Sequence, residues 1–137
     1  MNQTPGLRQA VVLDCEGLSR AVGADPYIRS LVNAAYLGKR RVIVSVVTLI
    51  EATHPGLDRG AYNWVVSRLS VVPLTKELAS AASQLLEDAG RHGQSAAIDA
   101  IVCATALDAD EHPLIFTSDP DDLRALTGNR ASIVPLR

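Results

Sequence analysis

A short apolar run that ends in a carboxylate constrains this chain more than any other feature. The run is Ala10-Val11-Val12-Leu13, and Asp14 follows it directly. Consecutive apolar and β-branched residues of this kind are typical of a strand that is buried on both faces of a parallel sheet. In open α/β sheets, ligands bind beyond the carboxyl ends of the strands, near the point where the strand order reverses. If this first strand is central, Asp14 lies at that crevice.

Segments with strand and helix patterns alternate along the rest of the chain. Strands are expected over 10–14, 42–44, 70–74, 114–117 and 133–134. Helices are expected over 17–22, 26–37, 46–53, 62–69, 76–89, 96–109 and 120–128. This alternation predicts an α/β fold in which a parallel sheet carries helices on both faces. We expect one domain over 1–137, with residues 1–9 as a loose N-terminal lead-in.

Polar residues mark several of the expected helix starts. Asp25 precedes a proline, which is favoured at the first helical position, and Ser45 and Thr75 stand directly before apolar helical patterns. Ser95 is expected to open the helix over 96–109, which places Asp99 in the first turn of an otherwise apolar helix.

The composition places the chain among ordinary globular proteins. Of its 137 residues, 47% are hydrophobic and 20% are charged, and the net charge of −2 gives no global basic field. No apolar run approaches the roughly 20 residues of a membrane span, and the lead-in lacks the apolar core of a signal peptide. We therefore expect a cytoplasmic protein without a membrane segment. Cys15 and Cys103 form no metal-binding spacing, and both are expected to be reduced.

Four acidic residues stand where solvated residues are not expected. Asp14 ends the first strand, Glu51 lies in the apolar helix after the second strand, Asp99 follows Ile98, and Asp119 follows the fourth strand. Each has an ordinary explanation as a helix cap, a dipole partner or an edge residue. Taken together, they fall on the rim formed by strand ends and the first turns of helices.

A carboxylate cluster of this kind favours a bound cation. Two carboxylates about 4 Å apart repel each other by on the order of 4 kcal/mol at an effective dielectric constant of about 20. All the expected ligand atoms are oxygens, which favours Mg²⁺ or Mn²⁺ over zinc. Such a cation in an open site commonly acts on phosphate esters.

At this point the residues resemble a known family. The order is Asp14, then Glu51, then Ile98-Asp99-Ala100, then the segment 117–123 with the sequence Thr-Ser-Asp-Pro-Asp-Asp-Leu. This order, over essentially the whole chain, resembles the PIN-domain ribonucleases that serve as VapC toxins in VapBC toxin–antitoxin pairs. The resemblance implies a three-layer α/β/α sandwich around a central parallel sheet. It also implies endonucleolytic cleavage of RNA with Mg²⁺ or Mn²⁺.

The resemblance assigns roles to the four acids. Asp14 and Asp99 are expected to be direct metal ligands, while Glu51 and Asp119 are expected to hold a metal, a metal-bound water or the attacking hydroxide. Asp119 therefore joins the expected metal ligands, with Asp122 as a reserve because the position of this last acid varies in the family.

The resemblance also implies supporting residues and partners. Thr117 matches a hydroxyl residue that steadies the first aspartate, whereas Cys15 stands where many members have threonine or serine. The implied partners are an RNA substrate (tRNA, rRNA or mRNA), a VapB-type antitoxin protein that occludes the acidic pocket, and a second copy of the chain in a homodimer.

Two other function classes remain open from the sequence. The first is a non-catalytic PIN-fold module that binds RNA or a protein. The second is a Mg²⁺-dependent phosphatase of the haloacid dehalogenase type, which would need an aspartate at position 16 and a lysine near the last strands. Position 16 is Glu16, and the only lysines are Lys39 and Lys76. The basic run Lys39-Arg40-Arg41 is expected to be a solvated turn, although Arg40 and Arg41 are also candidates for phosphate contacts.

Overall fold

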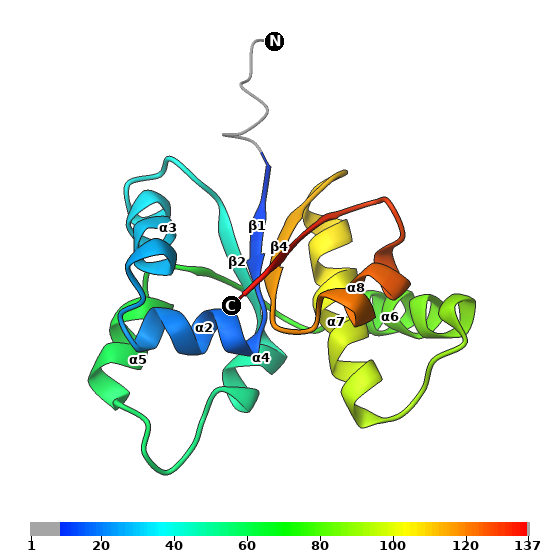
Figure 1. Ribbon diagram of the computed structural model, residues 1–137, viewed down its shortest axis with the longest axis horizontal. Helices are drawn as coiled ribbons and strands as arrows, with labels where there is room; N and C mark the ends of the chain where they lie inside the picture. The colour runs from blue at the N-terminus through cyan, green and yellow to red at the C-terminus, as the bar shows by residue number, and fades with distance from the viewer. Residues whose placement is uncertain (1–8, 137) are drawn as a thin grey trace, which may run out of the picture.

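A five-stranded parallel sheet forms the centre of the computed structural model, which describes residues 9–136 (Figure 1). The strands are β1 (Val11–Leu13), β2 (Val42–Ser45), β3 (Ser70–Val72), β4 (Leu114–Thr117) and β5 (Ser132–Pro135). Their order is β3-β2-β1-β4-β5, so the first strand is central. Val12 stands opposite Ile43 of β2 and Ile115 of β4. The predicted parallel sheet is confirmed, and its strand order reverses between β1 and β4.

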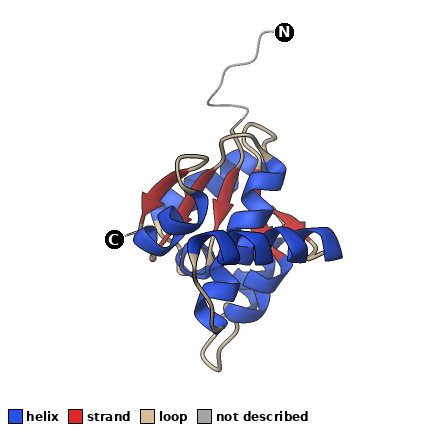
Figure 2. Ribbon diagram, turned by 90° about the vertical axis from the view of Figure 1, so that its right-hand side faces the viewer, coloured by secondary structure: helices blue, strands red, loops and turns tan. Residues whose placement is uncertain are grey.

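Helices cover both faces of this sheet. They are α2 (Cys15–Val22), α3 (Pro26–Tyr36), α4 (Val46–Glu51), α5 (Arg59–Val66), α6 (Lys76–Ala89), α7 (Gln94–Ala109) and α8 (Pro120–Thr127). Figure 1 shows α2, α3 and α5 on one side of the sheet and α6, α7 and α8 on the other. The view in Figure 2, turned by 90°, looks onto the α6 side with the strands behind. The predicted three-layer α/β/α fold is confirmed.

The apolar run in β1 supplies both layers of the core. Val11 and Leu13 pack in one buried cluster with residues of α2, α3 and α5, together with Phe116 of β4. Val12 points the other way and packs with residues of α6, α7 and α8. Side chains of a strand alternate between the two faces of a sheet, so a strand with helices on both sides needs an uninterrupted apolar run.

Several helix boundaries follow the expected capping chemistry. The Asp25 carboxylate accepts hydrogen bonds from the backbone N–H groups of Tyr27 and Ile28, at 3.0 and 3.1 Å. The Thr75 hydroxyl accepts a hydrogen bond from the Leu78 N–H at 3.1 Å and begins α6. These bonds satisfy N–H groups that have no partner inside their own helix.

Two helix starts were predicted wrongly. The helix expected over 62–69 runs from Arg59 to Val66, because the Asp58 carboxylate accepts a hydrogen bond from the Ala61 N–H at 3.0 Å and caps it earlier. The helix expected to follow Ser95 begins at Gln94, with Gly93 as the N-cap at a φ of 102°. Glycine adopts this positive φ without steric cost. Asp99 consequently lies in the second turn of α7, not in the first.

Other element ends also differ from the prediction by one to three residues, and three of them have a clear cause or cap. The strand expected over 70–74 ends at Val72, because Pro73 has no N–H to donate to a neighbouring strand. The helix expected from position 17 begins at Cys15, because Asp14 is its N-cap. The helix expected to reach position 53 ends at Glu51, with Ala52 as its C-cap.

The N-terminal expectation is only partly covered by the structure. The expected lead-in over 1–9 lies outside the described residues except for Gln9, whose side-chain amide donates a hydrogen bond to the His112 carbonyl at 3.0 Å. Within residues 9–136, no helix is long and apolar enough to cross a membrane.

Candidate metal centre

Asp14 lies at the carboxyl end of the central strand and is held there by two backbone groups. One of its carboxylate oxygens, Oδ1, accepts a hydrogen bond from the Gly17 N–H at 2.9 Å and caps α2. The other, Oδ2, accepts a hydrogen bond from the Ser118 N–H at 3.2 Å, just beyond β4. Burial raises the pKa of Asp14, while hydrogen bonds from Gly17, Thr117 and Ser118 oppose this effect. Its carboxylate therefore bridges the ends of β1 and β4.

Asp119 occupies the N-cap position of α8 without capping the helix. Its side chain accepts no hydrogen bond from the N–H groups of α8. Its own N–H donates to the hydroxyl of the buried Thr117 at 2.9 Å, and the same hydroxyl also bonds to Asp14. Thr117 thus connects the two acids that follow β1 and β4. The Asp119 carboxylate is left available for another role.

Three carboxylates come together at this rim. One oxygen from each of Asp99, Asp119 and Asp122 lies within 4.8 Å of the others, which is a spacing that a single cation can bridge. Two full negative charges at this separation repel each other by about 3 kcal/mol at an effective dielectric constant of about 20. This group, hereafter the acid cluster, includes Asp122, which the sequence had offered only as a reserve.

Glu51 lies outside the acid cluster but still interacts electrostatically with Asp14 and Asp119. It is the last residue of α4, and its side chain is exposed. Partial burial and the charges of Asp14 and Asp119 raise its pKa. Cys15, the first residue of α2, also has a raised pKa, because of burial and then because of the Glu51 charge. Glu51 is therefore coupled to the acids through the field, whereas Asp99, Asp119 and Asp122 are within reach of one shared ion.

Asp99 is the acid of this site whose charged form is most strongly disfavoured. Burial, followed by the charges of Asp119, Asp122, Asp14 and Glu51, raises its pKa to about 7. A carboxylic acid with such a pKa is half protonated near neutral pH. Without a cation the neighbouring carboxylates repel the charged form of Asp99, and a bound cation would favour that charged form.

A basic residue that the sequence did not single out lies beside the acid cluster. Arg91 forms an ion pair with Asp122, with an Nη1 to Oδ1 distance of 2.5 Å. A pocket of about 390 Å³ opens at this point, lined by both residues together with His92, Ser95 and Asp99. Arg91 and Asp122 are 31 positions apart in the sequence, so no local pattern connects them.

The thiols near the site are poorly suited to bind a metal. Burial, and then the Asp99 charge, raises the pKa of Cys103 to about 12, and the pKa of Cys15 is raised as well. Metals bind the thiolate form, which a raised pKa disfavours. The donor set therefore consists of carboxylate oxygens and fits a hard cation such as Mg²⁺ or Mn²⁺.

Comparison with known proteins bears on the fold. No family model matches this chain, and no curated protein matches it in sequence. Among solved structures, it is similar to the crystal structure of VapBC2 from Rickettsia felis bound to a DNA fragment from its promoter. The match has a TM-score of 0.65 and covers 92% of this chain and 99% of the other. The chain has a PIN-like fold. At 14% sequence identity this likeness establishes the architecture alone.

In this PIN-like fold, the predicted site residues occupy one rim of the sheet. Asp14 and Asp119 follow the two strands that flank the reversal of strand order, and Asp99 reaches the same point from α7. The structure thus brings Asp14, Asp99 and Asp119 together and adds Asp122. Glu51 stands at the edge of this group.

Proposed function

We propose that this chain is a metal-dependent endoribonuclease, formed by a single PIN-like domain over 1–137, and the toxin of a type II toxin–antitoxin pair. The observation that supports this most directly is the acid cluster, which stands where the strand order of a PIN-like fold reverses. Open α/β sheets bind their ligands at such a point. The similar structure is a VapBC complex, which favours an antitoxin among the partners of this chain.

The residues of this chain divide the proposed work among them. Asp99 and Asp119 would hold the cation together with Asp14 or Asp122. The Thr117 hydroxyl positions the Asp14 carboxylate. Mg²⁺ or Mn²⁺ supplies charge that stabilises the phosphate transition state and lowers the pKa of water. Glu51, with its raised pKa, is placed to accept a proton at the outer edge of the site.

RNA is the proposed substrate, in the form of tRNA, rRNA or mRNA. The proposed protein partners are a VapB-type antitoxin, whose tail would cover the acid cluster, and a second copy of this chain. A cationic side chain from the antitoxin would compensate the crowded carboxylates in the same way as a metal does.

The phosphatase alternative is disfavoured by Glu16. That chemistry needs a second acid at this position facing the site, but Glu16 pairs with Arg20 one turn along α2, with an Nε to Oε2 distance of 2.9 Å. Lys39 lies before β2, at the edge of the sheet opposite the acid cluster. The non-catalytic binding module is the alternative that the first experiment separates from the nuclease.

The decisive experiment is an RNA cleavage assay. Purified chain is incubated with total bacterial RNA in Mg²⁺ or Mn²⁺, with EDTA in a parallel reaction, and compared with the Asp14→Asn variant. We expect discrete fragments that disappear with EDTA and with the variant. Asparagine also caps helices, so this substitution removes the charge while α2 keeps a cap.

The control is Asp121→Asn, because the Asp121 side chain is 99% exposed on the same helix as Asp122 and lies outside the acid cluster. Cleavage should persist in this variant. Intact RNA with metal-loaded wild-type protein would contradict the nuclease and favour the binding module. The toxin role is tested by expression in a bacterium, where growth should stop with wild type and continue with Asp99→Ala. Equal growth with wild type and Asp99→Ala would contradict the toxin role but not the nuclease activity.

A further inference from the structure

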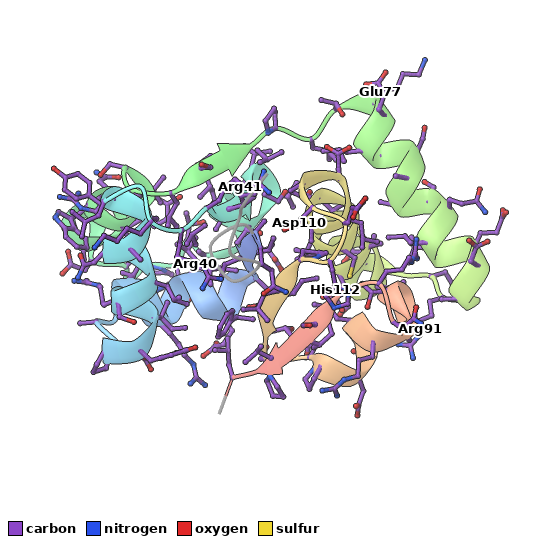
Figure 3. The ribbon with its side chains drawn as sticks, turned by 90° about the horizontal axis from the view of Figure 1, so that it is seen from above. Arg40, Arg41, Glu77, Arg91, Asp110 and His112 are labelled. Carbon is purple, nitrogen blue, oxygen red and sulfur yellow. The ribbon has the colours of Figure 1, made fainter. Side chains whose placement is uncertain are left out.

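A second pocket lies at the edge of the sheet where the strands begin, opposite the acid cluster. It has a volume of about 880 Å³ and is lined by residues of the α3–β2 loop and the start of β3. Its charged lining residues are Lys39, Arg40, Arg41 and Arg68, and none of its lining residues is acidic. Figure 3 looks onto this edge and shows Arg40 and Arg41 near the middle, with Arg91 away to the side. We refer to it as the basic pocket.

Arg40 is the most unusual residue of the basic pocket. Its Nε and Nη2 atoms are buried and have no hydrogen-bond partner among residues 9–136. Lys39 and Arg41 are exposed but Arg40 is half-buried, so the prediction that 39–41 form a solvated turn is wrong for these two atoms of Arg40. Buried N–H groups without an acceptor cost free energy that an anionic ligand would recover.

The loop that carries Arg40 is held in place by its own backbone. The N–H groups of Lys39 and Arg40 both donate to the Ala34 carbonyl, at 2.8 and 3.3 Å. Gly38, with a φ of 73°, allows the chain to turn directly after α3. The two side chains are thus presented by a fixed backbone, which reduces the entropy that a ligand must overcome.

Arg68 connects the basic pocket to exposed aromatic rings. Its guanidinium lies over the Trp64 ring at 4.0 Å and over the Tyr36 ring at 4.6 Å. It also donates a hydrogen bond to the Trp64 carbonyl at 3.1 Å. Tyr36 is 65% exposed and stands at the end of α3, next to the loop that lines the pocket. Cationic grooves beside aromatic faces are typical of surfaces that bind single-stranded nucleic acids.

The acidic residue nearest to these cations is largely committed elsewhere. Asp110 lies 3.9 Å from Arg41 and accepts hydrogen bonds from the Ala10 N–H at 2.6 Å and the His112 N–H at 3.1 Å. Arg41 in turn donates to the Ala109 carbonyl at 2.8 Å. Lys39 and Arg40 form no ion pair with any described residue. The positive charges of Lys39 and Arg40 are therefore uncompensated by any described acid.

We propose that the basic pocket binds the phosphate backbone of a single-stranded nucleic acid, with a base stacked on Tyr36. Arginine side chains are suited to phosphate oxygens because their N–H groups form a planar fork. The pocket is larger than one inorganic ion requires, and its charges continue onto an aromatic surface. The choice of RNA as the ligand rests on the proposed function, whereas the assignment of phosphate rests on the pocket itself.

The test is binding of a fluorescently labelled single-stranded RNA, measured by anisotropy in EDTA so that no cleavage occurs. We expect Arg40→Gln to weaken binding at least tenfold and Lys39→Gln with Arg40→Gln to weaken it further. The slope of log K against log salt should fall in magnitude by about 0.7 for each phosphate that the variant no longer neutralises. Tyr36→Ala should weaken binding without changing this slope, because stacking releases no counterions.

Lys76→Gln provides the matched control, because Lys76 begins α6 beside Glu77, far from Arg40 in Figure 3. It removes one positive charge and should bind RNA like wild type. Equal losses in Lys76→Gln and Arg40→Gln would overturn the proposal, as would wild-type binding in the Lys39 and Arg40 double variant. Thermal unfolding of each variant checks that a loss of binding is not a loss of folding.

Competition identifies the source of the phosphate. Single-stranded DNA should compete with the labelled RNA through its backbone, whereas ATP should compete weakly. Displacement by ATP at equal phosphate concentration would assign the basic pocket to free nucleotides and overturn the nucleic-acid proposal. A chain that binds RNA through Arg40 and cleaves nothing would support the basic-pocket proposal and contradict the nuclease. RNA cleavage by wild type, with RNA binding unchanged in Arg40→Gln, would support the nuclease and contradict the basic-pocket proposal.

Discussion

The side chain of Asp14 has two structural roles that use different oxygens. Oδ1 caps α2 through Gly17, and Oδ2 holds the start of the loop after β4 through Ser118. Both bonds oppose the effect of burial, which raises the pKa of this carboxyl group. Asp99 has no such hydrogen bonds among the causes of its shift, and burial and the neighbouring acids raise its pKa to about 7.

Neighbouring acids on α8 allow the ligand set to be defined. Asp122→Asn should weaken Mn²⁺ binding by at least tenfold, because the Asp122 carboxylate lies within the acid cluster. Asp121→Asn should leave it unchanged, since that side chain points into solvent and pairs with Arg124. Isothermal titration calorimetry measures both. If Asp119→Asn abolishes binding while Asp122→Asn binds like wild type, Asp122 serves only as the partner of Arg91.

The pKa of Asp99 gives a stability prediction with a definite sign. The folded value of about 7 exceeds the value of about 3.9 expected in the unfolded chain. The folded state therefore binds more protons between these values, so this group's stabilising contribution is complete below pH 4 and is lost as the pH rises through 7. In EDTA, Asp99→Asn should melt several degrees above wild type at pH 8 and closer to it at pH 4.

Thermal unfolding across this pH range provides the measurement, with Asp121→Asn as the control that should follow wild type. Added Mn²⁺ should raise the melting temperature of wild type at pH 8 and have little effect on Asp99→Asn. Parallel melting curves of wild type and Asp99→Asn at every pH would show that the acids around Asp99 do not repel it.

The unpaired guanidinium of Arg40 should reduce stability in the absence of a ligand. Replacing a partly buried charge with an apolar side chain of similar length often stabilises a protein. Arg40→Met should therefore raise the free energy of unfolding by about 1 kcal/mol relative to wild type. Arg41→Met should lose stability instead, because the Arg41 guanidinium donates to the Ala109 carbonyl. Urea denaturation distinguishes the two, and a loss of stability in both would indicate that Arg40 has a partner.

At the scale of single elements, α6 offers a test of capping. Thr75→Ala removes the hydroxyl that accepts the Leu78 N–H and should cost about 1 kcal/mol of folding free energy. Thr75→Ser keeps the acceptor and should cost less. Urea denaturation measures both variants, and equal stability of Thr75→Ala and wild type would show that water replaces the cap at no cost.

The sequence was sufficient for the elements whose signals are local. The apolar run before Asp14 identified the central strand, and the caps at Asp25 and Thr75 identified two helix starts. The start of α7 was wrong, because Gly93 begins the helix through a backbone conformation and not through a side-chain hydrogen bond. A glycine N-cap has no side-chain acceptor to distinguish it in the sequence.

The candidate site was predictable to the extent that parallel strands end at one edge. Asp14 and Asp119 could be placed there from strand ends alone, and the structure brings them together with Asp99. The pairing of Arg91 with Asp122 depends on how α6 and α8 are positioned relative to each other, which residues 31 positions apart do not reveal. The buried N–H groups of Arg40 were missed because a run of basic residues is usually solvated, and their burial depends on how the chain folds around them.

At the scale of the whole molecule, opposite charges occupy opposite edges of the sheet. The acid cluster lies beyond the strand ends, and the basic pocket lies before the strand starts. If both proposals hold, one RNA molecule must pass over the surface to reach both. Arg40→Gln should therefore slow the cleavage of long RNAs and leave short oligonucleotides unaffected. Cleavage rates over a series of RNA lengths measure this. An equal effect at all lengths would contradict the idea that one RNA molecule spans both sites.

The central position of β1 also has a consequence for how the protein is made. The hydrogen bond between Ser118 and Asp14 joins residues 104 positions apart, and β4 is the second neighbour that β1 requires. A ribosome has therefore synthesised most of the chain before the acids of β1, α7 and α8 can meet. A chain that ends before α8 lacks Asp119 and Asp122, so under the proposed nuclease function it could not yet attack the messenger or ribosome that is producing it.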